Sequence, residues 1–160
     1  MTVAPRLRHY LEAQHVDYEI LEHRPTRSAM QTAESCHIPA QQLAKAVLLD
    51  TKDDYLLAVL PSDRRLDLSE LREELGSKPR LVDEDELTVI FDDCEMGAVP
   101  AVGSGYGVAT IVDDRLIEQP DIYFEGGDHA SLIHVDQSAF RQLTKSAQHG
   151  RFSELWTEVD

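Results

Sequence analysis

Residues 44–61 read AKAVLLDTKDDYLLAVLP, a stretch with two apolar runs that are separated by a short polar segment. The runs cover residues 46–49 and 55–60, and residues 50–54 between them are polar. Two apolar runs joined by a short polar link are typical of a β-hairpin. We therefore predict an antiparallel pair of strands here, and its first strand begins directly after Lys45.

The segments on both sides of this hairpin show both helical and strand-like patterns. Apolar residues at helical spacing predict helices, whereas alternating apolar residues or short apolar runs predict strands. The predicted helices cover residues 5–14, 28–36, 68–75 and 83–87, with a last helix capped by Asp136, and the predicted strands cover residues 16–20, 108–112, 116–117, 122–124 and 132–135. Because helices and short antiparallel strands are mixed without regular βαβ alternation, we expect an α+β fold.

Two segments allow more than one interpretation. Residues 88–91 either continue the preceding helix or begin an extended segment. The tail over residues 144–160 is polar, although three of its apolar residues suit one more docked helical turn: Phe152, Leu155 and Trp156. Because a chain of 160 residues fits a single core, we expect one domain over residues 1–160 that includes this tail.

The composition is ordinary for a soluble globular protein, with 42% hydrophobic and 28% charged residues. No apolar run is long enough to span a bilayer, and residues 1–10 lack the apolar centre of a secretory signal. We therefore expect a cytoplasmic protein without a membrane partner. Two cysteines are too few for a disulfide scaffold, and the histidines show no HxxxH or HxH spacing. We expect neither a metal nor a cofactor.

The net charge is −15, from 15 basic and 30 acidic residues. Non-specific nucleic-acid binding depends on the neutralisation of phosphates, so this charge argues against a DNA partner. A small local pocket for one terminus of an RNA remains compatible with it. The acidity itself is explained either by solubility or by a salty cytoplasm.

Lys45 stands directly before the first apolar run of the hairpin. A lysine at the edge of a buried strand brings its ammonium group close to the core, which is costly unless the charge is paired. One interpretation is a cation that holds a phosphate, a carboxylate or an ester carbonyl. The alternative is a lysine whose stem lies along the strand edge while its ammonium group stays in water.

Residues 97–103 read GAVPAVG, so two glycines bracket a proline. Such a loop can bring backbone N–H groups close to a ligand, because glycine allows close approach and proline stiffens the chain. Preset N–H donors of this kind stabilise a developing oxyanion. The alternative is a tight surface loop between strands. A phosphate-binding loop is excluded, because no GK[ST] sequence follows.

Residues 126–129 read GGDH and precede the strand predicted at residues 132–135. They place a titratable pair, Asp128 and His129, at a junction between loop and strand. His129 could orient a water molecule, or bind a hydroxyl or phosphate group. The alternative is a turn in which Asp128 caps backbone groups. A serine hydrolase is not expected, because the chain has no GxSxG sequence.

Four pieces of the sequence resemble, in their order and spacing, the YbaK/prolyl-tRNA-synthetase-associated domain family, the freestanding relatives of the editing domain of bacterial prolyl-tRNA synthetase. The pieces are EHRPT at residues 22–26, LAKAVL at 43–48, GAVP at 97–100, and GGDH at 126–129 followed by LIHV at 132–135. The resemblance runs from residue 5 to residue 143. It implies a curved mixed β-sheet, partly barrel-like, with helices packed around it.

The resemblance also implies an activity, the hydrolysis of the ester that joins a mischarged amino acid to the terminal adenosine of tRNA. Lys45 is the residue most closely tied to this activity, and we expect Gly97 and His129 to act with it as catalytic residues. We expect the rest of the loop and the neighbouring aspartate to bind the substrate: Ala98, Val99, Pro100, Ala101, Gly103 and Asp128. The expected partner is the acceptor end of mischarged tRNA of the proline acceptor, with an aminoacyl-tRNA synthetase or an elongation factor as a further partner.

Two features depart from the family pattern. Pro100-Ala101 stands where many relatives have two prolines, and the GGxSP form of the cysteine-editing branch is absent. The chain therefore looks closer to the alanine-type or broader editing branches. Two other functions are compatible with the sequence. One is a non-catalytic regulatory module that binds an aminoacyl ligand, tRNA or a synthetase, and the other is an acidic protein-interaction domain, which predicts that residues 97–107 line no pocket.

Overall fold

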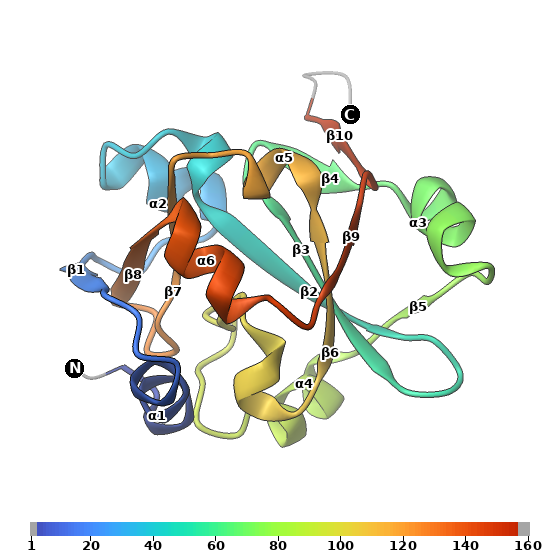
Figure 1. The fold of residues 1–160 in the computed structure, drawn as a ribbon, viewed down its shortest axis with the longest axis horizontal. Helices are drawn as coiled ribbons and strands as arrows, with labels where there is room; N and C mark the ends of the chain where they lie inside the picture. Colours follow the sequence, from blue (N-terminus) through green and yellow to red (C-terminus); the bar gives the residue numbers. More distant parts are fainter. Residues whose placement is uncertain (1–2, 157–160) are drawn as a thin grey trace.

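The computed structural model describes residues 3–156, in which helices surround a set of twisted sheets (Figure 1). The helices are α1 (Pro5–Ala13), α2 (Ala29–Ser35), α3 (Leu68–Leu75), α4 (Glu84–Ile90), α5 (Asp114–Ile117) and α6 (Gln137–Leu143), with 3-10 turns η1 (Ala40–Gln42) and η2 (Gly103–Tyr106). The strands are β1 (Glu19–Glu22), β2 (Ala44–Asp50), β3 (Tyr55–Pro61), β4 (Arg64–Leu66), β5 (Arg80–Leu81), β6 (Ala109–Asp113), β7 (Asp121–Glu125), β8 (Ser131–Asp136), β9 (Gln148–Gly150) and β10 (Ser153–Leu155). The α+β class is confirmed.

The predicted hairpin, β2 and β3, forms the middle of a five-stranded sheet with the order β5-β2-β3-β6-β9. Its register places Lys45 opposite Leu60. Contrary to the expectation of antiparallel strands, β6 pairs with β3 and β9 pairs with β6 in parallel. The sheet is therefore mixed.

A second, antiparallel sheet has the order β1-β8-β7, and β10 pairs with β4. A single bridge between Leu43 and Tyr123 joins the chain before β2 to β7. Over residues 3–156 these strands form separate sheets and do not close into a barrel. The bridge brings the start of β2 close to the C-terminal half of β7, which ends at Glu125.

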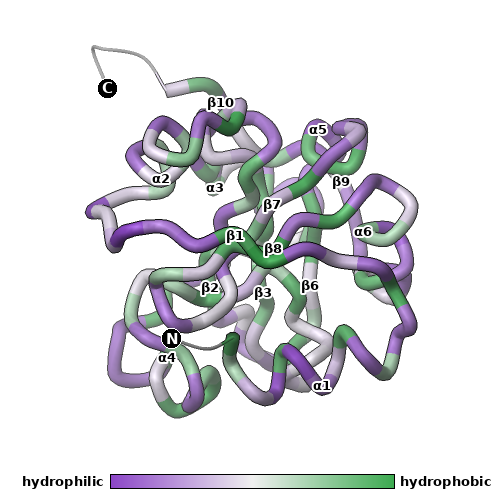
Figure 2. The backbone as a smooth tube through the Cα atoms, turned by 90° about the vertical axis from the view of Figure 1, so that its left-hand side faces the viewer, coloured by the Kyte–Doolittle hydropathy of each residue, from purple (hydrophilic) through white to green (hydrophobic). Residues whose placement is uncertain are grey.

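The main hydrophobic core lies where α1 and α6 pack on the two larger sheets. Leu7 and Leu11 of α1 and Phe140 of α6 are fully buried there. Figure 2 shows the hydrophobic stretches gathered in the central strands, while hydrophilic stretches follow the outer loops. Burial of each such side chain stabilises the fold by about 1.5–3 kcal/mol. The apolar residues that recur at helical spacing in the sequence are therefore the ones that face the core.

Local signals in the sequence correctly predicted several helix ends. Ser28 caps α2 by accepting a hydrogen bond from the Gln31 N–H group at 3.2 Å. Gly76 ends α3 in the left-handed conformation, with φ of 79°. Residues 88–90 continue α4, so the helical alternative holds for this segment.

Two predictions near the C-terminal end were wrong. Residues 116–117 belong to the helix α5 and not to a strand, because Asp113 caps a turn there by accepting from the Arg115 N–H group at 2.9 Å. Residues 152–156 do not form a helical turn. Instead, β10 pairs with β4 and the Phe152 side chain is fully buried against Leu71 and Leu49.

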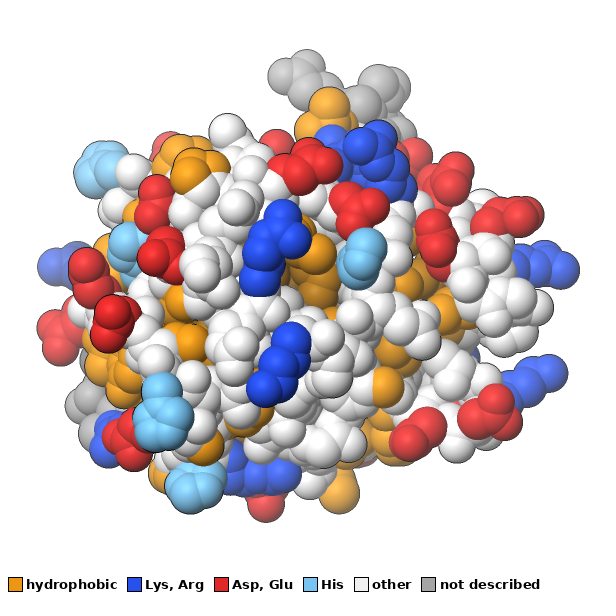
Figure 3. Space-filling view, viewed as in Figure 1, with side chains coloured by type: hydrophobic (Ala, Val, Ile, Leu, Met, Phe, Trp, Pro, Cys, Tyr) orange, Lys and Arg blue, Asp and Glu red, His pale blue; other side chains and the backbone are white. Residues whose placement is uncertain are grey.

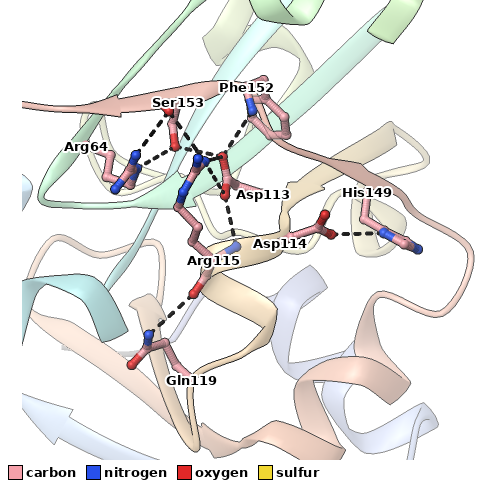
Figure 4. A network of polar contacts seen from close by, with 8 residues as sticks. All are labelled: Arg64, Asp113, Asp114, Arg115, Gln119, His149, Phe152 and Ser153. Carbon is pink, nitrogen blue, oxygen red and sulfur yellow. Dashed lines mark hydrogen bonds and ion pairs between the residues drawn. The ribbon is translucent and has the colours of Figure 1, made fainter.

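A buried carboxylate holds this C-terminal segment in place (Figure 4). Asp113 is fully buried and accepts hydrogen bonds from the Ser153 hydroxyl group at 2.7 Å and the Phe152 N–H group at 3.2 Å. The Arg64 side chain donates to the same Ser153 oxygen at 2.9 Å. Asp113 therefore fixes both the start of α5 and the path that leads to Trp156. None of the helices within residues 3–156 is sufficiently long and apolar to cross a membrane.

Candidate active site

A cavity of about 310 Å³ opens beside the start of β2. Its wall consists of residues 26–29 and Thr32 in and before α2, residues 43–46, Leu87 of α4, Met96, Gly97 and Val99 of the following loop, and Glu125 with His129. The cavity therefore brings together all four sequence pieces on which the family resemblance rests. It also argues against the acidic interaction domain, because that alternative predicts that residues 97–107 line no pocket.

Lys45 contributes a half-buried ammonium group to this wall. Burial lowers the pKa of Lys45 below its ordinary value, and the negative charge of Asp63 opposes that shift. Among residues 3–156 the ammonium group has no ion-pair partner, although it lies 5.1 Å from the centre of the Trp156 ring. A lysine that merely extends into water would not be desolvated in this way. Lys45 is thus a cation with free hydrogen-bonding capacity inside the cavity.

Two residues of the loop after α4 line the cavity and have backbone N–H groups without an acceptor in the described part of the chain. Gly97 has φ of 81°, a conformation that side chains disfavour. Within the described part of the chain, the N–H groups of Gly97 and Val99 have no hydrogen-bond acceptor. These two residues are the ones from the GAVPAVG loop that line the cavity. Their amides can therefore bind an oxygen of a ligand.

Other residues predicted to bind the substrate lie behind this wall. Ala98, Pro100, Ala101 and Gly103 are buried and do not line the cavity. A Cβ atom on Gly103 would lie 2.6 Å from the Val108 carbonyl oxygen, so this glycine packs against the chain leading into β6. We propose that these four residues shape the loop, while Gly97 and Val99 contact the ligand.

Asp128 and His129 have different surroundings, although they are neighbours in sequence. Asp128 accepts hydrogen bonds from the Ala130 N–H group and the Ser131 hydroxyl group, both at 3.0 Å. His129 has φ of 59° and lies on the cavity wall. Asp128 thus stabilises the turn that points His129 at the cavity, while Asp128 itself does not line the cavity.

Sequence reasoning missed a buried acid and a buried histidine at this site. The Glu125 side chain is 13% exposed, and its Oε1 atom lies 3.5 Å from His23 Nε2. The rings of His23 and His129 meet edge to face with centroids 6.4 Å apart. Burial raises the pKa of Glu125, while the neighbouring charges of His23 and His129 oppose this shift. The sequence did contain a signal for Glu125. A glutamate that ends the apolar run IYFE, directly before two glycines, places a charged group at the end of a buried strand.

The arrangement offers a cation, unpaired amide donors and a buried acid in one cavity. It suits an ester whose carbonyl oxygen needs stabilisation and whose charged groups need partners. No group of three or more metal-binding side chains is found within residues 3–156. Part of the chain that carries the cavity, residues 23–143, matches the family model described as the aminoacyl-tRNA editing domain.

Several solved structures share this fold. A protein described as "a putative trans-editing enzyme for prolyl tRNA synthetase" has a TM-score of 0.83 at 23% identity, covering 94% of this chain and 96% of its own. A structure from work on epitope backbone grafting onto scaffold proteins has a TM-score of 0.80 at 22% identity, covering 96% and 97%. A "putative signal transduction protein" from Marinobacter aquaeolei VT8 has a TM-score of 0.75 at 23% identity, covering 92% of this chain and 30% of its own. No curated protein matches the chain.

Proposed function

Because the chain belongs to the aminoacyl-tRNA editing domain family, we propose that it hydrolyses the ester bond of mischarged tRNA, with tRNA of the proline acceptor as its substrate. The family predicted from four short sequence pieces is confirmed by this match. The likeness in fold to a protein described as "a putative trans-editing enzyme for prolyl tRNA synthetase" supports an editing function. Catalysis and the choice of the proline acceptor are our proposal.

The observation that carries the proposal is the meeting of Lys45 with the amides of Gly97 and Val99 on one cavity wall. An aminoacyl ester is already reactive, so the site needs to hold its carbonyl and admit a water molecule. The two amides would bind the carbonyl oxygen as its negative charge develops. Lys45 would bind the phosphate of the terminal nucleotide or the carbonyl side of the ester.

No Ser/His/Asp triad supplies a nucleophile in this proposal. The sequence lacks a GxSxG elbow, and the hydroxyl groups on the cavity wall belong to α2 and the segment that precedes it. We propose that the ribose hydroxyl group of the substrate activates the attacking water. The protein then positions and stabilises, and substrate positioning alone can supply a large share of a rate enhancement.

We propose that the cavity accepts a small aliphatic amino acid. Ala29, Ala46 and Val99 give its wall an apolar part that suits such a side chain. Discrimination against one extra methylene in such a pocket is worth about 1–3 kcal/mol. Alanine attached to tRNA of the proline acceptor is therefore our first candidate, which agrees with the alanine-type branch expected from the loop sequence.

The acidity of the protein limits how it can meet a tRNA. Figure 3 shows acidic side chains spread around one face of the molecule, and the net charge is −15. Long contact with the phosphate backbone is disfavoured by this charge. We propose that only the acceptor end enters the cavity, where Arg27 and Lys45 contribute positive charge. A synthetase or elongation factor would deliver the tRNA in the cytoplasm.

The test is deacylation of a panel of mischarged tRNAs by catalytic amounts of protein. The panel starts with alanyl- and cysteinyl-tRNA of the proline acceptor, and Lys45→Ala is compared with Lys145→Ala. Lys145 is exposed after α6 and lies outside the cavity, so it matches the change in total charge. We expect Lys45→Ala to lose at least about 100-fold in rate, the scale for removal of one oxyanion-stabilising group, and Lys145→Ala to keep full rate. Full activity of Lys45→Ala would sink the assignment, and binding without turnover would favour the regulatory module.

A further inference from the structure

Three polar atoms without partners gather on one side of the cavity. Within residues 3–156, the buried side-chain nitrogen and oxygen atoms that lack a hydrogen-bond partner include His23 Nε2, Glu125 Oε2 and His129 Nδ1. Glu125 and His129 also line the cavity. Buried polar atoms are nearly always paired in proteins, so a cluster of three in one place calls for an explanation.

The hydrogen bonds of the cluster show which kind of partner it lacks. His23 Nδ1 lies 2.8 Å from the Arg24 carbonyl oxygen, which only accepts, so Nδ1 carries a proton and donates to this oxygen. This Nε2 atom faces Glu125 Oε1, and an ionised carboxylate also only accepts. The second carboxylate oxygen, Glu125 Oε2, is buried without any donor, so the cluster lacks a hydrogen-bond donor at this atom.

The charge of the cluster points the same way. Among the described residues, no lysine or arginine forms an ion pair with Glu125, and the side chain at ion-pair distance from its carboxylate is that of His23, at 3.5 Å. Burial therefore disfavours the ionised carboxylate, and a positive group brought by a ligand would restore it. An ammonium group combines both requirements, because it has three N–H donors and a positive charge.

The neighbouring loop fixes where such a group would belong on the substrate. A Cβ atom built on Gly97 would lie 3.8 Å from His129 Cε1. The amide proposed to bind the ester carbonyl is thus adjacent to the acceptor cluster. In an aminoacyl ester the α-ammonium group is attached to the carbon next to the carbonyl, so one amino acid spans both positions.

Building on the proposed deacylase function, we propose that Glu125 binds the α-ammonium group of the aminoacyl ester, with His129 as a neighbouring acceptor and His23 as the residue that positions Glu125. The site would then recognise esters with a free α-amino group. Esters that lack the positive charge at this position would bind without the interaction, and their carbonyl would be held less well against the loop.

The test compares alanyl-tRNA with lactyl-tRNA, in which a hydroxyl group replaces the ammonium group at nearly the same size. Rates are divided by the spontaneous hydrolysis rate of each ester, because the ammonium group also activates the ester itself. We expect the wild-type protein to prefer alanyl-tRNA by about 10- to 100-fold, the range for a hydrogen bond to a charged group. Glu125→Gln should lose this factor on alanyl-tRNA and keep the wild-type rate on lactyl-tRNA.

Glu22→Gln is the matched control, because Glu22 is exposed on β1 of the same sheet, does not line the cavity and should leave both rates unchanged. Equal normalised rates of the wild-type protein on the two esters would overturn the inference even if Glu125→Gln failed to fold. Equal loss on both esters in a folded Glu125→Gln protein would also overturn it, by showing a structural role. No turnover of either ester by the wild-type protein would refute the deacylase function itself, and this inference with it.

Discussion

Replacement of Asp113 by alanine tests how the buried carboxylate holds the C-terminal segment. In the native structure Asp113 accepts three hydrogen bonds, from the Arg115 N–H group at 2.9 Å, the Phe152 N–H group at 3.2 Å and the Ser153 hydroxyl group at 2.7 Å. The Arg115 guanidinium group lies 3.4 Å from the same carboxylate. The substitution removes a helix cap and the anchor of residues 152–153 in one step.

The expected loss of stability follows from these contacts. Loss of an aspartate cap costs about 1 kcal/mol. The buried Phe152 N–H group, left without an acceptor, costs about 1–3 kcal/mol more. The Arg115 side chain is 30% exposed, so water can solvate its charge after the substitution and the loss of this ion pair adds little. We therefore expect Asp113→Ala to lower the free energy of unfolding by about 2–4 kcal/mol.

Urea unfolding of Asp113→Ala and Asp136→Ala gives the measurement and its control. Asp136 caps α6 by accepting from the Ala139 N–H group at 2.8 Å, but it is exposed and anchors no other segment. Asp136→Ala should cost only about 1 kcal/mol. An equal cost of the two substitutions would refute the reasoning, because the buried contacts to Phe152 and Ser153 would then contribute nothing. Amide exchange at Phe152 should accelerate in Asp113→Ala alone.

Two further predictions concern the loop and the buried acid. Gly97→Ala and Gly76→Ala place a side chain at φ of 81° and 79°, so both variants should lose about 1–2 kcal/mol of stability in urea unfolding. Only Gly97→Ala should slow deacylation, and equal slowing by both variants would contradict a role of the loop. Because the folded-state pKa of Glu125 is raised, its contribution to stability is present below pH 4.5 and is lost as pH rises through the folded-state pKa. As pH rises above 4.5, the free energy of unfolding of Glu125→Gln should therefore increase relative to that of the wild-type protein, measured by urea unfolding at each pH. A difference between the two proteins that does not change with pH would contradict this prediction.

Local chemistry explains which parts of the fold could be predicted. The hairpin of residues 44–61 and the cap at Ser28 depend on neighbouring residues, so the sequence alone carries their signal. The parallel pairing of β6 with β3 depends on chain segments that are far apart. The same holds for β10, whose register with β4 is set by contacts around Asp113 and Ser153. Apolar residues at 152–156 fitted a helical turn equally well, and only these distant contacts decide between the two.

The site divides in a similar way. Lys45 and His129 stood out because a charged or titratable residue adjoins an apolar strand or a glycine pair, and both lie on the cavity wall. Glu125 stood next to the same glycine pair, yet its burial and its approach to His23 arise from the pairing of β7 and β8 with β1. The sequence contains the acid, but it does not show that Glu125 Oε2 and His129 Nδ1 lack hydrogen-bond partners. The structure adds that information, and it is the basis of the proposed ammonium site.

The proposed substrate and the charge pattern of the cavity complement each other. The start of β2 and the Gly97 loop supply positive charge and N–H donors, which suit phosphate and carbonyl oxygens. The end of β7 supplies acceptors around Glu125, which suit an ammonium group. An aminoacyl ester of a nucleotide carries both kinds of group, so the pattern would bind it in one orientation. A protein with a net charge of −15 can then act on tRNA without contacts along the phosphate backbone, because recognition is concentrated at the terminus that enters the cavity.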